Sequence, residues 1–302
     1  MDVEIVKSNG QKFRLSDYGV VQDFVVNSID RSVTRESVDG RKGSVDYGTN
    51  IGDRSISVPM IFKASDLHDY AHLRDELFGI LDDDEPFYIR EMRRKEYLQY
   101  EFVDFGQSPT WSNGVENEYV NGKQYKVRLD SNISPEQWDD KPNGDITIEF
   151  VTSGLPYAET TYTTLELHDS GYAHSAEKYG LVDNIDDEKV KYRFTESNFT
   201  VYNAGNVTVE PESMELVIQI SNASTTGTLS LKNITTGEEF RLTKNLSERH
   251  ISLRGMNILD GTVNTFRDSN RKLISLVPGD NQFEITGATF SQVWFEFRFL
   301  YK

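Results

Sequence analysis

Two histidines have the spacing of metal ligands on one face of a helix. His68 and His72 stand four residues apart in a segment, 66–81, whose apolar residues recur at helical spacing. Both could face one zinc ion, with Asp69 or Asp75 adding oxygen. The strong zinc motif has a glutamate directly after the first histidine, whereas here an aspartate follows and no third, distant ligand can be named. We therefore favour two exposed histidines on a polar helix face.

Two further groups of carboxylates are candidates for chemistry. Asp183–Glu188 offers the oxygen ligands that calcium prefers but lacks the central glycine and spacing of an EF-hand loop, so a solvated acidic loop is favoured. Glu296 lies between Trp294 and Arg298 and could pass for a glycosidase carboxylate. No second carboxylate partner is evident, and an exposed ion pair between Glu296 and Arg298 is the simpler interpretation.

The overall composition excludes several classes of function. There is no cysteine, which removes disulfides, thiolate metal sites and cysteine nucleophiles. The net charge of −17 disfavours binding to nucleic acid or to a membrane surface. No serine elbow, phosphate loop or dinucleotide fingerprint is present. We expect a soluble protein that is not an enzyme and has no cofactor and no metal.

Alternating polar and apolar residues predict β-structure in the first half. In Arg54–Ala64, four apolar residues share one face, as in a half-buried strand. Pro59 cannot donate to a ladder, so we predict an edge strand or a bulge there. The dipeptides Asn9-Gly10, Asp39-Gly40 and Asn121-Gly122 favour hairpins and hence antiparallel sheet.

The first half also contains one helix and one long excursion. The helix is predicted over Asp66–Leu81, capped by Ser65 or Asp66. The excursion, Gly106–Asn143, is too long for an ordinary connection. Its aromatic residues, together with Pro59 of the predicted edge strand, are the candidates for a subunit interface: Trp111, Tyr119, Tyr125 and Trp138.

The stretch Ser153–Thr164 interrupts the alternation, and the acid-rich Leu165–Lys189 that follows it reads as a loop. We therefore predict two domains, 1–155 and 156–302. The second domain should contain short strands and no helix, typical of a sandwich or jelly roll. The predicted strands are Lys191–Thr195, Phe199–Asn203, Leu216–Ile220, Leu229–Asn233, Glu239–Thr243, Ile251–Arg254, Gln282–Thr286 and Val293–Tyr301.

Several segments resemble the distal tail proteins of long, non-contractile-tailed phages that infect Gram-positive bacteria. The most specific segments are Val201–Asn206 followed by Pro211, Leu229–Glu238, and Leu276–Phe283 with the closing aromatic strand to Tyr301. In the first half the resemblance is looser and rests on Arg54–Phe62, Asp66–Leu81 and Pro86–Ile89.

This resemblance implies a mainly β protein with an N-terminal β-sandwich or split barrel carrying one helix. A jelly-roll-like β-sandwich, similar to galectins and carbohydrate-binding modules, would follow. It implies a homo-oligomeric ring, commonly of six subunits, at the tail tip or baseplate of the virion. The ring would be made by the first domain, with the second at its rim. The implied partners are the tail tube protein, a tail-associated or baseplate protein, and the tape-measure protein.

Two other functional classes compete with a structural hub. A carbohydrate-binding module that contacts host cell-wall glycans is the alternative, because Trp111, Trp138 and Trp294 could stack on sugar rings. A glycosidase acting on the cell wall has no positive support beyond the abundance of carboxylates.

Overall fold

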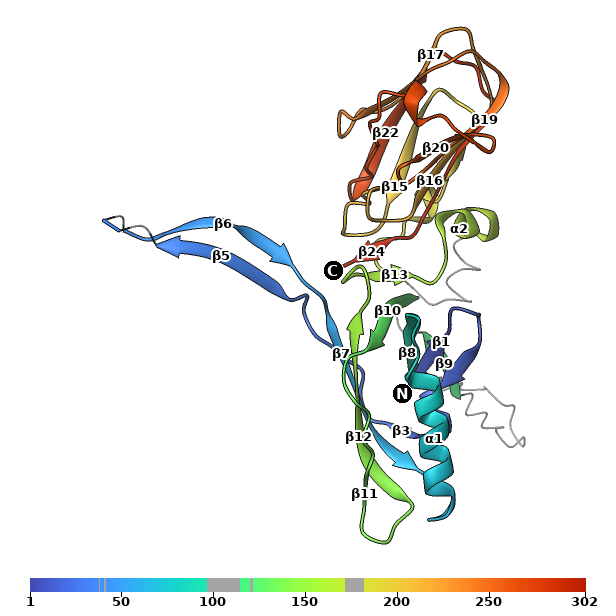
Figure 1. The fold of residues 1–302 in the computed structure, drawn as a ribbon. Coiled ribbons are helices and arrows are strands. Elements are labelled where there is room, and N and C mark those ends of the chain that lie inside the picture. The colour runs from blue at the N-terminus through green and yellow to red at the C-terminus, as the bar shows by residue number, and fades with distance from the viewer. Residues whose placement is uncertain (38, 41, 97–114, 120–121, 172–181) are drawn as a thin grey trace, which may run out of the picture. The chain divides into compact units, whose positions relative to one another are not determined.

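The computed structural model describes residues 1–37, 39–40, 42–96, 115–119, 122–171 and 182–302. The chain divides into two compact units, Met1–Ala158 and Glu159–Lys302. The strand pairs whose register is described are antiparallel, as the turn dipeptides predict (Figure 1). The chain is mainly β, which confirms the predicted fold class. No described helix is both long and apolar enough to cross a membrane.

The first unit is a β-sheet with one long helix. Its sheet runs in the order β2-β1-β8-β10-β12-β7-β3, with β4 beside β7, β9 beside β8 and β11 beside β12. The elements are β1 (Asp2–Val6), β2 (Lys12–Arg14), η1 (Leu15–Asp17), β3 (Gly19–Val21), β4 (Val25–Val26), β5 (Arg31–Ser37), β6 (Ser44–Ile51), β7 (Ser55–Lys63), α1 (Asp69–Leu81), β8 (Phe87–Glu96), β9 (Val115–Tyr119), β10 (Lys123–Leu129), β11 (Glu136–Gln137) and β12 (Asn143–Thr152).

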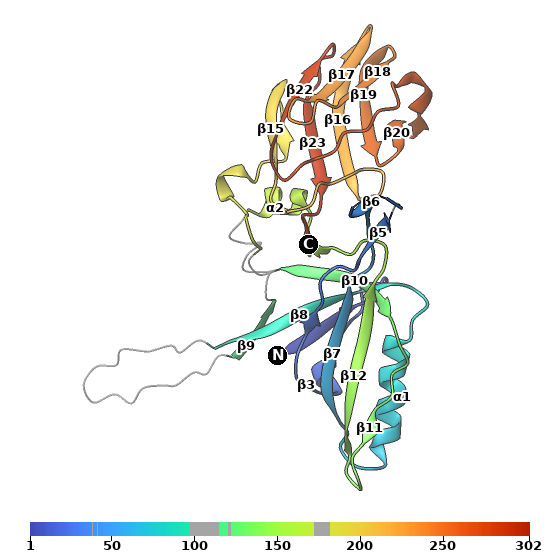
Figure 2. The same ribbon diagram turned by 90° about the vertical axis from the view of Figure 1, so that its left-hand side faces the viewer.

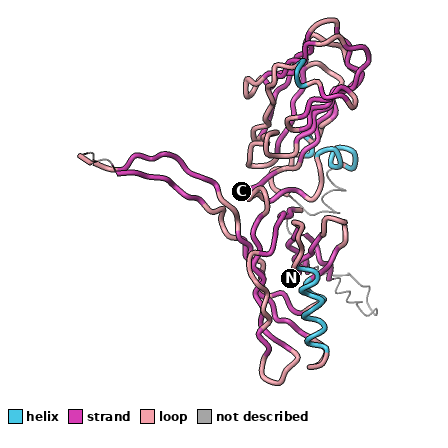
Figure 3. The backbone as a smooth tube through the Cα atoms, viewed as in Figure 1, coloured by secondary structure: helices cyan, strands magenta, loops and turns pink. Residues whose placement is uncertain are grey.

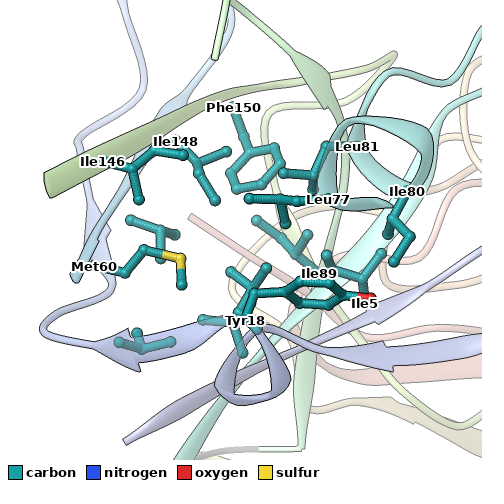
Figure 4. Close-up of a cluster of buried hydrophobic side chains, with 14 of the residues drawn as sticks. Ile5, Tyr18, Met60, Leu77, Ile80, Leu81, Ile89, Ile146, Ile148 and Phe150 are labelled. Carbon is teal, nitrogen blue, oxygen red and sulfur yellow. The ribbon is translucent and has the colours of Figure 1, made fainter. Parts of the chain in front are cut away.

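Alternation along β7 and β12 creates the core of this unit. Ile56, Val58, Met60 and Phe62 point inward from β7 and are at most 1% exposed. The facing residues of β12 and residues of β1 and β8 join the same cluster, so the sheet folds over its own inner face (Figure 4). Helix α1 closes this core with Leu77 and Leu81, both 0% exposed.

The start of α1 differs slightly from the prediction. The helix begins at Asp69. The preceding turn is closed by the Asp66 carboxylate, which accepts from the backbone N–H groups of His68 and Asp69 at 2.8 Å each. The Asp69 carboxylate accepts from Ser65 N at 3.0 Å. The predicted capping residues therefore act one turn before the helix itself.

The prediction that Pro59 marks an edge strand or a bulge is wrong. β7 is an interior strand, with β12 on one side and β3 and β4 on the other. Pro59 pairs in regular register with Thr147, and its carbonyl accepts from Gln22 N at 2.9 Å. The ring nitrogen of Pro59 points to the same side of β7 as its carbonyl. On this side β3 pairs with residues 60–62 and β4 with residues 56–57, so Pro59 lies in the gap between the two pairings. An interior proline is tolerated because no partner there requires its missing N–H.

The second unit is a sandwich of two sheets. The sheet order is β14-β23-β16-β19-β20-β21 in one and β15-β22-β17-β18 in the other. The elements of this unit and of the connection before it are β13 (Ala158–Thr160), α2 (Thr164–Ser170), η2 (Asp187–Lys189), β14 (Arg193–Phe194), β15 (Asn198–Asn203), β16 (Leu216–Thr225), β17 (Thr228–Asn233), β18 (Glu239–Thr243), β19 (Leu246–Arg254), β20 (Asn257–Asp260), β21 (Val263–Asn264), η3 (Phe266–Asp268), β22 (Gly279–Thr286), β23 (Gln292–Phe297) and β24 (Leu300–Tyr301).

Aromatic side chains join the two sheets of the sandwich. Phe199 stacks on Phe283 at 5.6 Å between ring centroids, and Phe283 contacts Phe295 of the opposite sheet at 5.0 Å. The alternation predicted for the last strand is confirmed for Val293, Phe295 and Phe297, which are 0–2% exposed. Such rings bury a large apolar area and fix the spacing of the two layers.

The prediction of a helix-free second domain is wrong. Helix α2 lies in the segment interpreted as loop, and its N-terminus is a capping box. Thr163 Oγ1 accepts from Glu166 N at 3.3 Å, and the Glu166 carboxylate accepts from Thr163 N at 2.8 Å. The Thr-x-x-Glu spacing was visible in the sequence and is the signal of a helix start. Gly171, with φ of +78°, ends the helix.

Removing an interior ring should test this account of the first core. Phe150 is 0% exposed and meets Phe87 edge-to-face at 6.0 Å. We expect Phe150→Ala to lower the free energy of unfolding by about 3–5 kcal/mol, measured by urea denaturation of the full chain. Leu67→Ala, at a side chain 52% exposed, is the control and should change it by less than about 0.5 kcal/mol. Equal effects would contradict the assigned core.

Candidate assembly surfaces

A two-stranded hairpin projects from the first unit. β5 and β6 pair with each other, and no third strand among the described residues joins them. Figure 1 shows this hairpin, here called the arm (residues 31–51), extending away from the sheet that contains β7, and in Figure 2 the arm points toward the viewer. Every described residue of β5 and β6 is exposed except Val45, which is half-buried. An isolated hairpin is marginally stable in water, so packing against another protein surface would stabilise the arm.

The base of the arm is held firmly. Gly52 N donates to Asp30 O and Asp30 N donates to Asp53 O, both at 2.8 Å. Immediately beyond, the buried Arg54 exchanges bonds with Thr152: Thr152 N donates to Arg54 O and Arg54 N donates to Thr152 Oγ1, both at 2.9 Å. The arm therefore continues directly into the interior strand β7 (Figure 3), and its direction is set by the sheet.

One face of the arm carries three exposed apolar side chains beside Arg31 and Thr49. Val33 pairs with Thr49 and Arg31 with Ile51, and directly paired residues share a face, so Val33 and Ile51 lie on the same side. Alternation along β6 places Tyr47 with them, beside the register shift after Thr34. These three side chains are 42%, 62% and 53% exposed for Val33, Tyr47 and Ile51 respectively. This face has the composition of an interface.

The arm also differs in charge from the rest of the chain. It contains four basic residues and three acidic ones, a net charge of +1, while the whole chain carries −17 and the remainder therefore −18. The residues are Arg31, Arg35, Arg41 and Lys42 against Glu36, Asp39 and Asp46. The remainder of the chain thus carries a net charge opposite in sign to that of the arm.

A second apolar surface lies at the edge of the first sheet. Val20 of β3 and Val25 of β4 are 54% and 38% exposed and lie on the outward face with half-buried Ile61 and Pro59. We call these four residues the edge patch. Within the described residues, no strand pairs with the outer side of β3 or β4. Free backbone groups beside exposed valines invite another strand to pack there.

The structure brings two of the predicted interface residues to one sheet face. Pro59 pairs with Thr147 of β12, and the Trp138 indole N–H donates to the Asp145 carboxylate of the same strand at 2.8 Å. Asp145 and Thr147 both point outward and are exposed. Pro59 and Trp138 therefore both border the outward face of β12, although their role in an interface stays a prediction.

The other three candidates are placed differently. Tyr125 lies in β10 and packs on its own core, 6.2 Å from Phe24 between ring centroids. Burial raises the pKa of the Tyr125 phenol. Trp111 lies outside the described residues, and for Tyr119 the structure describes the backbone in β9 but not the side chain. The role of these residues in an interface also stays a prediction.

The candidate chemical groups of the sequence do not converge on a catalytic or metal site. His68 and His72 are exposed, with ring centroids 5.5 Å apart. No group of three or more metal-ligating side chains occurs among the described residues. In the acidic loop, the Asp186 carboxylate accepts from Glu188 N at 3.1 Å and so caps a turn.

The predicted ion pair between Glu296 and Arg298 is wrong. Arg298 instead lies 3.6 Å from the Glu159 carboxylate and donates to Thr160 O at 2.7 Å. Two residues on one face of a strand are about 7 Å apart, whereas Glu159 and Thr160 belong to the neighbouring segment β13. Arg298 therefore binds Glu159 and Thr160 of the neighbouring segment and not Glu296.

The comparisons with known proteins agree with the β-rich architecture. Residues 8–152 match the family model of the phage tail protein RIFT-related domain. The full chain has the fold of the Dit protein (gp 19.1) of phage SPP1, described as a paradigm of the hub adsorption apparatus in phages that infect Gram-positive bacteria. The resemblance to distal tail proteins is confirmed.

The extent of these similarities differs. The SPP1 Dit structure has a TM-score of 0.61 at 13% identity and covers 98% of this chain and 99% of its own. Chains of the phage p2 baseplate, in its activated conformation with strontium and with calcium, both have TM-scores of 0.43, at 10% and 9% identity. They cover 98% and 99% of this chain, and 97% of their own in both cases. No curated protein matches the chain significantly in sequence.

The exposed arm leads to a prediction about the isolated chain. Because Tyr47 and Ile51 contact solvent and not the core, Tyr47→Ser with Ile51→Ser should change the free energy of unfolding by less than about 0.5 kcal/mol. Urea denaturation at concentrations where the protein is monomeric measures this. A loss of about 2 kcal/mol or more would show that the arm packs on its own chain.

Proposed function

We propose that this chain is a structural hub of the phage tail tip and that copies of it form a closed ring, six in number. The ring joins the tail tube to the baseplate and carries host-adsorption components. The family-model match of residues 8–152 and the fold of the whole chain support a role in the tail. The observation that carries the ring is the arm, an exposed hairpin with three exposed apolar side chains on one face.

The arm and the edge patch are the two halves of a head-to-tail contact. A ring of identical subunits needs two different, complementary surfaces on each copy. The ring closes when the rotation that relates one subunit to the next, repeated once for each subunit, completes a full turn. The arm of one copy supplies Val33, Tyr47 and Ile51, and the edge patch of the next supplies Val20 and Val25. Burying these side chains removes apolar surface from water on both sides. The ring-forming role of the first domain, 1–155, and the peripheral role of 156–302 are parts of this proposal.

This function requires two partners, the tail tube protein on one face of the ring and a baseplate protein on the other. The tape-measure protein is a third partner, whose end would lie near the ring. No catalysis is needed for such a role. The net charge of −17 favours a wall along which DNA moves without binding.

Charged substitutions on either surface should prevent ring formation. We expect Tyr47→Asp in the arm and Val20→Asp in the edge patch each to raise the concentration at half-assembly by at least about tenfold, equivalent to about 1.4 kcal/mol. Mass photometry and multi-angle light scattering of the full chain over a concentration series measure this.

Met256→Asp and Val263→Asp are the matched controls, because these side chains are 62% and 59% exposed in the second unit. They should assemble as the unchanged protein does. A protein that stays monomeric at all concentrations, or controls that fail as completely as the arm variant, would contradict the proposed ring.

A further inference from the structure

The outward face of the larger sheet in the second unit carries an aromatic side chain among polar groups. Trp294 of β23 pairs with Arg193 of β14 on one side and with Gln219 of β16 on the other, so the three side chains form one row on this face. The inward neighbours Val293 and Phe295 are both 0% exposed and already fill the core. Trp294 is half-buried on the face turned away from that core.

A second row lies one step along the strands. Glu296, Val217 and Arg254 pair across β23, β16 and β19, and alternation puts them on the same face as Trp294. This row lines a pocket of about 450 Å³, which Thr163, Glu215 and Arg298 also border. Its volume lies within the range of about 300–1,000 Å³ found for small-ligand sites.

Two acidic and two basic side chains line this pocket: Glu215, Glu296, Arg254 and Arg298. Arg298 is engaged with Glu159 and with Thr160 O. Arg254 makes one long hydrogen bond, from Nε to Ser252 Oγ at 3.4 Å. In the described part of the chain, no ion pair involves Glu215, Glu296 or Arg254. Their hydrogen-bonding groups therefore remain able to bind a ligand.

We propose that this face of the second unit binds a neutral saccharide. An indole ring offers a flat apolar surface to the C–H face of a sugar. Carboxylate and guanidinium groups present paired acceptors and donors that match neighbouring hydroxyls. An anionic polymer would require an excess of cations here, and the basic side chains that line the pocket do not outnumber the acidic ones. Saccharide binding is not required by the hub function and does not rest on ring formation.

Isothermal titration calorimetry on the full chain tests this site with three probes. The probes are chitohexaose, a neutral polysaccharide released from Gram-positive cell walls, and a teichoic acid as the phosphate-bearing competitor. We expect at least one neutral probe to bind at micromolar to millimolar concentrations. We expect Trp294→Ala and Arg254→Ala each to weaken this binding at least tenfold, and Trp294→Phe to retain most of it.

The controls separate the site from the fold and from the ring. Trp138→Ala and Arg267→Ala alter the same residue types elsewhere and should bind as the unchanged protein does. Tyr47→Asp should bind with unchanged affinity per subunit, so that failure of ring assembly and failure of this site are distinguishable. Circular dichroism melting confirms that each variant is folded, and Arg254→Ala, at an exposed position, decides the outcome if Trp294→Ala is unstable.

Three results would overturn the proposal. One is that neither neutral probe binds at millimolar concentrations. Another is that folded Trp294→Ala and Arg254→Ala bind as well as the unchanged protein. The third is that the teichoic acid alone binds.

Discussion

The nine-residue ladder between β7 and β12 is the constraint on which the first unit depends. Its inward side chains form the core that α1 closes, and its outward side chains form the face that Pro59 and Trp138 border. β3 and β4 attach to β7 on the side where Pro59 lacks an N–H, which leaves them as short strands at the sheet edge. The ladder also ends at Arg54, whose bonds to Thr152 fix where the arm leaves the sheet.

The arm is a consequence of this arrangement and not an independent element. β7 pairs with β12 over residues 55–63 and with β3 and β4 on its other side, and it is joined through Gly52 to a hairpin that no third described strand pairs with. Such a hairpin contributes little to its own fold and orders fully when a neighbour covers it. A rigid base with an uncovered end suits a connector between subunits, because the base sets the direction in which the contact is made. The second unit buries its two sheets against each other and needs no such neighbour.

Sequence reasoning succeeded where one face of a strand is buried and failed where it is not. The apolar face of Arg54–Ala64 and of Val293–Phe297 was predictable, because alternation is the signature of a half-buried strand. The arm lacks a buried face, so only its Asp39-Gly40 turn was visible, and Val33, Tyr47 and Ile51 were not identified as interface candidates. Helix α2 is short, and its Thr163-x-x-Glu166 signal was hidden among turn residues. Local patterns do not specify contacts between segments that are distant in sequence. For this reason neither the pairing of β3 and β4 with β7 beside Pro59 nor the contact of Arg298 with Glu159 was predicted.

Hydrogen–deuterium exchange of the arm, compared between the monomeric and the assembled protein, tests the central claim most directly. The amides of Arg31–Ser37 and Ser44–Ile51 should exchange quickly in the monomer and should be strongly protected in the ring. The amides of β7 and β12 should be protected in both states, since their ladder belongs to the core of each subunit. Equal exchange of the arm in the two states, fast or slow, would contradict the claim that a second copy of the chain covers it.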